Sequence, residues 1–455
     1  MIPNHILSVR SQVPEQGPPA ASPTHVQWHI IGLLAVVSAL TYLDRLNLSI
    51  AGKYIQDEFA LSMKTMGWIL SAFGWGYALF QIAGGWLGDR YGPRKVLTLA
   101  ILWWSVFTAG TAIAPRLPLA TGFGLPASFV ILRFMVGIGE ASTFPNSNKV
   151  VAYWMGYAHR ALGNSLPFVG IGVGGSVTPV LIACLMQRWG WRTAFYVCGI
   201  LGVVVALVWY RYATDRPEQH SGVNAAELAM IRSSRAANQP VGGRSVSLPA
   251  NAPWKKILSS RSVWALISSA FCIGYAAYIF YTWFYIYLLR VRGLSVMQGG
   301  LWGSAPFLAI SLLAPLGGWF SDRAVARFGH RRGRQTALWV GVLCSAAMLG
   351  LGSHATNTTA AVILLALAAG FNLFATATMW AVCIDLAPTF SGSLSGLMNT
   401  LGTLGGAISP ILTAHIATRW GWPQALDFAA LVSMAAGLLW ALVRADENVE
   451  QRSVA

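Results

Sequence analysis

The sequence predicts an all-α integral membrane protein with about twelve transmembrane helices in two homologous six-helix bundles. Of its 455 residues, 55% are hydrophobic and only 10% are charged, whereas a soluble domain has about 25% charged residues. A helix needs about 20 mainly apolar residues to cross a bilayer. Segments that meet this need begin near Ile30, Met66, Val96, Ser128, Ala161, Trp191, Val263, Gly299, Ala337, Ala360, Ser393 and Ala425.

Three short motifs recur in the same order and with nearly constant spacing, which indicates two homologous halves. The pairs are residues 84–90 (GGWLGDR) and 317–323 (GGWFSDR), 174–179 (GGSVTP) and 405–410 (GGAISP), and 188–191 and 419–422 (both RWGW). We therefore expect a tail at 1–28, a first bundle at 29–211, a linker at 212–260 with a short helix near 225–232, a second bundle at 261–445 and a tail at 446–455.

The net charge of +16 reflects membrane topology and does not indicate nucleic-acid binding. If the N-terminal tail is inside, most basic residues fall on the cytoplasmic side, as the positive-inside rule requires. Both termini are then cytoplasmic. The short connections favour a bacterial inner membrane, and we expect a monomer in the lipid bilayer.

The stretch that bears most directly on function is residues 41–49, TYLDRLNLS, at the end of the first apolar run. Charged side chains inside a membrane helix cost about 2.5 to 3.5 kcal/mol each on insertion scales, so they usually have a partner or a function. Helical spacing places Arg45 on one face with Tyr42, and Asp44 on another with Asn47. Arg45 is the candidate ligand for a substrate carboxylate, because a guanidinium donates two parallel hydrogen bonds.

The second acid inside the first half is Glu140, seven residues after Arg133. A buried carboxylate can bind and release a proton near physiological pH, so Asp44 and Glu140 are the candidate proton carriers. Arg133 is expected to support Glu140 by pairing with it. The alternative is a structural ion-pair network that only holds the helices together.

No constellation typical of an enzyme accompanies these residues. The eight histidines are scattered and lack the spacing of metal ligands, so we expect no metal, no cofactor and no catalytic centre.

Two groups of residues resemble a known family. Residues 85–95 (GWLGDRYGPRK) resemble the signature of the major facilitator superfamily. Residues 42–47 (YLDRLN), Arg133 with 139–141 (GEA), and 144–148 (FPNSN) resemble the anion:cation symporter family. That family includes carriers of galactonate, glucarate and hexuronates. The resemblance covers residues 28 to 445 and implies that Asp44 and Glu140 carry protons.

The same resemblance implies substrate-binding positions. Tyr42, Tyr77 and Asn399 match residues that contact sugar acids in galactonate-like relatives. The other candidates are Tyr281, Trp283, Thr378 and Trp380.

Three positions depart from the family pattern. Gly170 replaces Gln, Met379 replaces a polar group, and Tyr285 stands where relatives have Pro. The first two suggest a less hydroxylated or differently shaped anion, and Tyr285 leaves the bend of its helix open.

The repeated GGW motif is expected to gate transport. In this fold such a loop resembles a latch, in which an aspartate accepts hydrogen bonds from a helix N-terminus or an arginine and glycines let helices approach. The gating candidates are Gly85, Asp89, Arg90, Arg94, Asp322 and Arg323.

These observations predict proton-coupled import of a small organic anion, such as a hexonate, hexarate or hexuronate, by alternating access. The alternatives are transport of another carboxylate, an exporter or exchanger of the same fold, and a sensor without flux. Arg45 and Arg133 argue against an organic cation as substrate.

Overall fold

The computed structural model describes residues 22–61, 63–236 and 252–451, and the residues it describes form helices and no strand. The first half contains α1 (Val26–Glu58), α2 (Met63–Tyr91), α3 (Pro93–Thr111), α4 (Pro118–Phe123), α5 (Leu125–Ala141), α6 (Thr143–Trp154), α7 (Arg160–Trp189) and α8 (Trp191–Tyr212). The second contains α11 (Arg261–Thr282), α12 (Phe284–Arg290), α13 (Val296–Gly303), α14 (Ala305–Phe328), α15 (His330–His354), α16 (Thr358–Leu386), α17 (Ser391–Trp420) and α18 (Trp422–Trp440). Between the halves lie α9 (Ala225–Ala236) and α10 (Trp254–Leu258).

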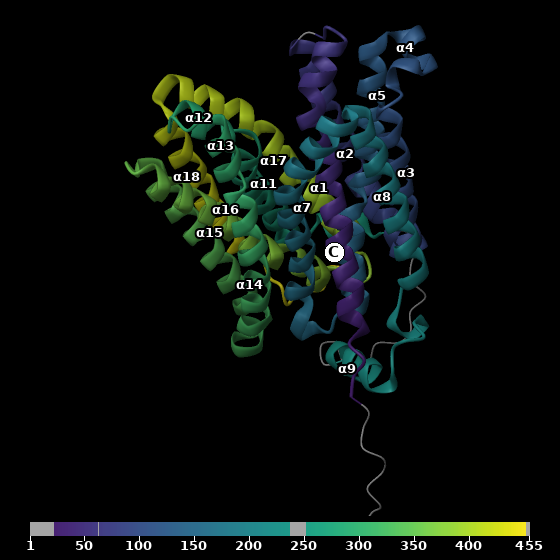
Figure 1. Cartoon of the computed structure of the whole chain (residues 1–455). Helices are drawn as coiled ribbons and strands as arrows, with labels where there is room; N and C mark the ends of the chain where they lie inside the picture. The colour runs from purple at the N-terminus through teal and green to yellow at the C-terminus, as the bar shows by residue number, and fades with distance from the viewer. Residues whose placement is uncertain (1–21, 62, 237–251, 452–455) are drawn as a thin grey trace, which may run out of the picture.

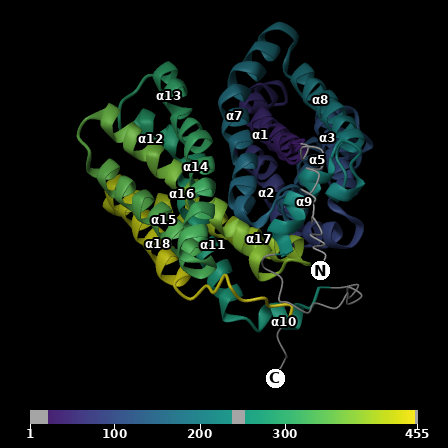
Figure 2. The ribbon, with the colours of Figure 1, turned by 90° about the horizontal axis from the view of Figure 1, so that it is seen from below.

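The two halves form two bundles side by side, as Figures 1 and 2 show. They meet where α2 packs against α17 and where α7 packs against α14. The sequence repeat relates α2 to α14 and α7 to α17, so these two contacts are equivalent. The predicted two-bundle, all-α architecture is confirmed.

Within the described residues, nine helical segments are long and apolar enough to cross a membrane. Three more long helices, α2, α3 and α17, complete the predicted set of about twelve. Both α2 and α17 lie between the halves, where small and polar residues replace the apolar side chains that lipid requires. The chain is therefore a multi-pass membrane protein.

Local chemistry explains where several helices break or turn. The ring of Pro145 lacks an N–H and would clash with the carbonyl of residue 141, and α5 ends at Ala141. In both RWGW motifs the glycine adopts a positive φ, 79° at Gly190 and 103° at Gly421. Only glycine adopts this conformation readily, so each motif makes the sharp turn between two antiparallel helices.

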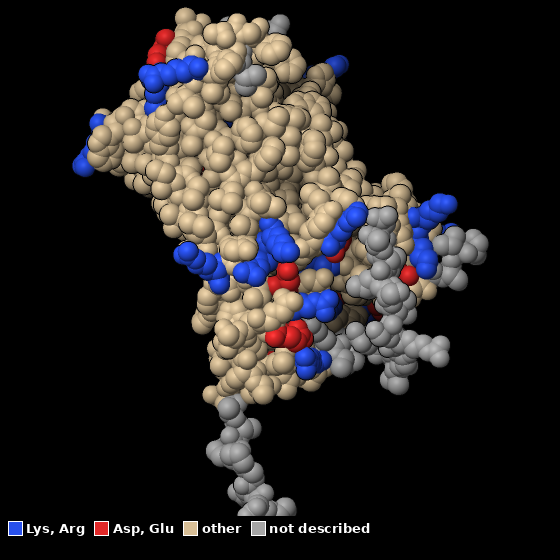
Figure 3. All heavy atoms as spheres, turned by 90° about the vertical axis from the view of Figure 1, so that its right-hand side faces the viewer, with Lys and Arg blue, Asp and Glu red and all other residues tan. Residues whose placement is uncertain are grey.

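We call the end of the bundle that carries α9 and α10 the linker end, and the opposite one the far end (Figure 1). On the face shown in Figure 3, Lys and Arg gather toward the linker end, some lie near the far end, and a broad region free of charge separates them. This distribution agrees with a membrane belt around the middle of the bundle.

The short helix expected in the linker is present as α9, and it is attached to the first bundle. Glu227 of α9 is fully buried. Its carboxylate accepts hydrogen bonds from the backbone N–H of Val26 at 3.1 Å and of Gln27 at 2.8 Å, at the start of α1. The part of the expected linker at 237–251 lies outside the described residues.

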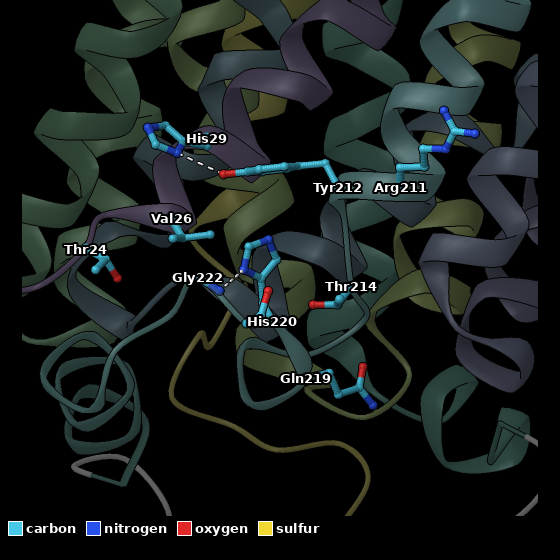
Figure 4. Close-up of a pocket in the computed structure, with 10 residues that line it drawn as sticks. Thr24, Val26, His29, Arg211, Tyr212, Thr214, Gln219, His220 and Gly222 are labelled. Carbon is cyan, nitrogen blue, oxygen red and sulfur yellow. Dashed lines mark hydrogen bonds between the residues drawn. The ribbon is translucent and has the colours of Figure 1, made fainter.

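A pocket of about 510 Å³ lies beside this attachment, between the start of α1 and the segment that follows α8 (Figure 4). Within it, the His29 ring nitrogen lies 3.0 Å from the Tyr212 hydroxyl, and His220 Nδ1 accepts from the N–H of Gly222. Arg211 points its guanidinium away from both imidazoles in Figure 4. The guanidinium and the two imidazoles of the pocket therefore do not converge on one point.

Candidate transport site

Arg45 and Glu140 form a buried ion pair between α1 and α5. Arg45 Nε lies 2.8 Å from Glu140 Oε2, and the two side chains are 19% and 0% exposed. Arg45 Nη2 and Glu140 Oε1 have no hydrogen-bond partner among the described residues. Each member of the pair thus keeps one polar atom available for a further ligand.

Aromatic rings surround the guanidinium of Arg45. Its Cζ lies 4.5 Å from the ring centre of Tyr77, 5.0 Å from that of Phe73 and 5.3 Å from that of Tyr42. Stacking of this kind suits a guanidinium and holds its plane in one orientation.

Tyr42 also contacts the second half of the molecule. Its ring centre lies 6.3 Å from those of Tyr281 and Phe307. Tyr281 and Phe307 stack on each other with a centroid distance of 6.1 Å. Arg45 therefore stands beside the interface between the bundles.

Asp44 points in a different direction, into the interior of the first bundle. Its side chain is 1% exposed, and Thr108 and Trp104 of α3 are its polar neighbours. Neither carboxylate oxygen has a hydrogen bond among the described residues. Asn47, which was expected to share this face, donates to Cys198 Sγ at 3.3 Å.

Arg133 lies between the two acids, but its pairing differs from the expectation. Its Nη1 donates to the backbone carbonyl of Asp44 at 3.4 Å, and its guanidinium lies 5.3 Å from the Phe73 ring centre. Glu140 takes Arg45 as its ion-pair partner instead. The expected Arg133–Glu140 pair is therefore wrong, because α1 brings Arg45 closer to that acid.

The four charged groups balance one another in a region of low dielectric constant. Asp44 and Glu140 supply two negative charges, and Arg45 and Arg133 supply two positive ones. Protonation of either acid would leave an excess positive charge that is costly to bury unpaired. An anion entering beside Arg45 would remove that excess.

A polar network connects the two bundles near this cluster. Asn399 Nδ2 of α17 donates to the Tyr77 hydroxyl at 3.2 Å and also to the Gln81 side-chain oxygen. Gln81 Nε2 donates in turn to Thr403 Oγ1 at 3.0 Å. Tyr77 and Asn399, which were singled out in the sequence, are thus brought together across the interface.

The remaining binding candidates are distributed over the second bundle. Trp380 packs against Phe144 of α6, with ring centres 6.0 Å apart, and Thr378 is fully buried. Trp283 lies elsewhere: its indole donates to the Pro410 carbonyl at 3.1 Å and packs against Trp422. The structure does not bring Trp283 into the cluster around Arg45.

Two of the three departures from the family pattern gain a structural explanation. A Cβ added to Gly170 would lie 2.0 Å from the carbonyl oxygen of Ala35, so Gly170 allows α7 to cross α1 closely. The helix that carries Tyr285 is interrupted at Trp283, between α11 and α12, so it breaks without proline. Met379 is buried.

At the linker end, Asp89 of α2 binds the N-terminus of α17. Its carboxylate accepts from the N–H groups of Gly392 at 3.2 Å and Ser393 at 2.7 Å, and from the Ser393 hydroxyl. Lys149 Nζ lies 2.9 Å from Asp89 and also donates to the Thr389 carbonyl. We call this set of contacts the Asp89 latch.

The repeat produces an equivalent set around Asp322 of α14, the Asp322 latch. Its carboxylate accepts from the N–H groups of Ala161 at 3.1 Å and Leu162 at 2.9 Å, at the N-terminus of α7. Arg334, which is fully buried, pairs with Asp322 at 2.9 Å and with Asp385 at 3.1 Å. Both aspartates therefore bind a helix N-terminus of the other half, the geometry expected of a latch.

The glycines of the motif allow the halves to approach. A Cβ on Gly85 would lie 2.1 Å from the Gly392 carbonyl oxygen, and one on Gly318 would lie 2.5 Å from that of Ala161.

The arginines of the motif bind elsewhere. Arg90 stacks on Trp86 and Tyr91 of its own helix, and Arg94 donates to the Tyr210 carbonyl at 2.6 Å. Arg323 is exposed. The latch aspartates take Lys149 and Arg334 instead.

Sequence reasoning missed Gln81, Thr403, Lys149, Phe73 and Phe307. Gln81 lies four residues after Tyr77 and Thr403 four after Asn399, so helical spacing from each predicted residue was the available signal. Lys149 is a lone cation in a span, and that alone makes a residue worth examining. Phe73 and Phe307 had no signal beyond ordinary apolar patterning.

Comparison with known proteins gives consistent results. A family model described as the Major Facilitator Superfamily matches residues 34–410. A probable galactarate/D-glucarate transporter of Escherichia coli is 33% identical over 408 residues, which cover 87% of this chain and 89% of that protein. A probable sulfoacetate transporter of Cupriavidus necator is 32% identical over 393 residues, covering 86% and 87%.

Among solved structures, that of a proton:xylose symporter bound to 6-bromo-6-deoxy-D-glucose matches with a TM-score of 0.70 at 15% identity. The match covers 94% of this chain and 98% of that one. At 15% identity, this match supports the fold alone. Among the described residues, no group of three or more His, Cys, Asp or Glu side chains could hold a metal ion.

Proposed function

Because the chain belongs to the Major Facilitator Superfamily, we propose that it is a proton-coupled symporter that imports a small organic anion, with sugar acids as the leading substrate class. The family and its relatives identify the chain as a transporter and not an enzyme. The relatives' names include galactarate, D-glucarate and sulfoacetate, all compact organic anions. The names of these relatives support a small organic anion as the substrate of this chain.

One observation carries the proposal: the buried pair of Arg45 and Glu140 beside the interface of the bundles. A guanidinium beside the interface of the bundles is a suitable ligand for a carboxylate. The Glu140 carboxylate already binds one nitrogen of this guanidinium, Arg45 Nε. A substrate carboxylate can compete for Arg45 once Glu140 is protonated. The same contact thus connects proton binding with anion binding.

Asp44 has a second role in this scheme. It is buried away from the interface, and neither of its oxygens has a hydrogen bond among the described residues. A proton on Asp44 would leave Arg133 as an unbalanced charge and raise the positive potential near Arg45. Protons on both acids would therefore favour anion binding without direct contact between Asp44 and the substrate.

The polar network of Tyr77, Gln81, Asn399 and Thr403 supplies hydroxyl and amide groups on one side of the site. Such groups recognise the hydroxyls of a sugar acid. A bound substrate would exchange hydrogen bonds with this network, which joins the two bundles. Binding would in this way favour one arrangement of the halves over another.

The latches close the linker end in this structure. With that end in the cytoplasm of a bacterial inner membrane, substrate and protons would enter from the far end. Opening of the latches would release substrate and protons into the cytoplasm. The site and both latches lie within a single chain, as expected for a monomer.

The proposal is tested by transport into proteoliposomes. A thermal-shift screen with D-glucarate, galactarate, D-galactonate, D-glucuronate, sulfoacetate and benzoate first identifies a ligand, since a ligand at a hundredfold excess over Kd stabilises by about 2.7 kcal/mol. Radiolabelled ligand is then added to vesicles with an acidic exterior. We expect accumulation that a protonophore abolishes.

Each other outcome identifies an alternative. Expulsion of preloaded ligand under the same gradient would indicate an exporter. Exchange without gradient-driven accumulation would indicate an exchanger, and binding without flux would indicate a sensor.

A further inference from the structure

The chain that follows α18 folds back under the second bundle and reaches the connection between α16 and α17. It runs beside α10, where it is yellow in Figure 2. Val443, Ala445 and Val449 are buried and belong to the same apolar cluster as Phe390. The N–H of Val449 donates to the Leu386 carbonyl at 2.9 Å. This segment is therefore a fixed part of the bundle.

Glu450, at the end of this segment, binds the two residues that precede α17. Its Oε1 accepts from the N–H of Thr389 at 2.9 Å and from that of Phe390 at 2.9 Å. Lys256 of α10 holds the backbone carbonyl of Glu450 at 3.3 Å. Burial raises the pKa of Glu450, while the amides of Phe390 and Thr389 and the charge of Lys149 oppose that rise.

The residues held by Glu450 are the ones that the Asp89 latch uses. The Thr389 carbonyl accepts from Lys149, which pairs with Asp89. Three and four residues further on, the N–H groups of Gly392 and Ser393 bind Asp89 itself. One short stretch of chain, 389–393, thus lies between the carboxylates of Glu450 and Asp89.

We propose that Glu450 is a positioning residue of the Asp89 latch. It fixes residues 389–390 so that the Thr389 carbonyl and the α17 N-terminus meet Lys149 and Asp89 together. The C-terminal segment thereby sets how firmly the linker end closes. This inference rests on the proposed role of the latch in gating.

The test measures closure of the linker end directly. Spin labels at Lys95→Cys of α3 and Arg327→Cys of α14, both exposed, report the separation of the halves by double electron–electron resonance in nanodiscs. The background has all five cysteines replaced by alanine. In it, Asp89→Asn and Glu450→Ala, which removes the oxygen that accepts from Thr389 and Phe390, are each expected to raise the ratio of open to closed molecules by about tenfold, which corresponds to about 1.4 kcal/mol.

A double-mutant cycle separates positioning from general stabilisation. If Glu450 acts through the latch, the Asp89→Asn, Glu450→Ala double variant opens at most twofold beyond Asp89→Asn alone. Glu227→Ala is the matched control, because that carboxylate also binds two N–H groups at the linker end but belongs to the first bundle. It should leave the open-to-closed ratio unchanged even if it lowers Tm.

Two results would overturn the inference while the latch stands: no opening in Glu450→Ala when Asp89→Asn opens, or fully additive effects in the double variant. No opening in Asp89→Asn would overturn the latch as well. Should Glu450→Ala fold poorly, Glu450→Met removes the same carboxylate and keeps the length of the side chain, and the same ratio is expected from it.

Discussion

Arg45 serves two purposes that only an arginine combines. Its Nε holds Glu140, its planar face lies against aromatic rings, and its Nη2 is left without a partner among the described residues. A lysine has one compact ammonium group and no planar face. The geometry therefore requires the guanidinium itself, and a positive charge alone does not replace it.

This requirement predicts the effect of Arg45→Lys. We expect initial uptake to fall at least tenfold, about 1.4 kcal/mol in transition-state terms, because the two-pronged contact with the substrate is lost. Uptake rates in proteoliposomes measure this. The matched control is Arg192→Lys, whose partner Glu58 lies in a largely exposed pair, and less than a twofold change is expected there. Unchanged uptake in Arg45→Lys would contradict the assignment.

Glu140→Gln imitates the protonated acid. In the proposed mechanism, anion binding by the wild type requires a proton on Glu140, so affinity should weaken as pH rises. The variant carries no charge to neutralise at this position, so its affinity should change less between pH 5.5 and 8 than that of the wild type, and Asp44 supplies the dependence that remains. It should exchange substrate but lose accumulation driven by a proton gradient.

Calorimetry across pH and parallel gradient and exchange assays test both halves of this expectation. Glu58→Gln, remote from the site, serves as the control. Gradient-driven accumulation that survives in Glu140→Gln would remove Glu140 from the coupling mechanism.

At the scale of elements, glycines determine how closely helices of the two halves approach. Gly85 faces the Gly392 carbonyl so closely that a methyl group has no room, whereas Gly32 of α1 has nothing within 4 Å of its added Cβ. Gly85 therefore lies at a contact between the halves, and Gly32 does not. Substitution of each glycine by alanine should affect closure of the linker end differently.

We therefore predict that Gly85→Ala weakens closure of the linker end by about 1–3 kcal/mol, the usual cost of overpacking. The spin-label pair on α3 and α14 should report a larger open fraction. Gly32→Ala should leave that fraction unchanged and, if anything, stabilise α1 by up to about 1 kcal/mol. Equal behaviour of the two variants would show that Gly85 does not control the approach.

The elements themselves could be predicted from sequence, but their contacts could not. The apolar runs located the spans, and the repeated RWGW motif located equivalent turns, because bilayer thickness and glycine geometry act locally. Helical spacing states which face a residue occupies but not which neighbour that face meets. For this reason Arg45 and Glu140 could be identified from the sequence, but Glu140 was expected to pair with Arg133. Trp283 was likewise expected in a site that it does not join.

Contacts between the halves were less predictable still. The pairing of Gln81 with Thr403 depends on how two bundles dock, and no periodic signal within either helix encodes it. Glu450 follows the last span in a tail without pattern, so nothing in the sequence relates it to residues 389–390. Such contacts require the assembled structure.

For the whole molecule, two latches that the repeat makes equivalent join the halves at the linker end. The Asp89 latch joins α2 to α17, and the Asp322 latch joins α14 to α7. Asp322 also pairs with the buried Arg334, which retains Asp385 as a second partner. The two latches share no residue, so their contributions to closure should add.

We predict that Asp89→Asn and Asp322→Asn each shift the spin-label distances toward the open linker end, and that the double variant shifts the open-to-closed ratio by about the product of the single effects.

A protein that rests open at the linker end presents its site to the far end less often. Uptake in the double variant should therefore fall through a lower maximal rate, while binding by isolated protein at low pH persists. Double electron–electron resonance and uptake kinetics on the same samples measure both quantities. If the double variant were no more open than the stronger single variant, the two latches would act as one unit, and the symmetry of the repeat would not extend to the energetics of closure.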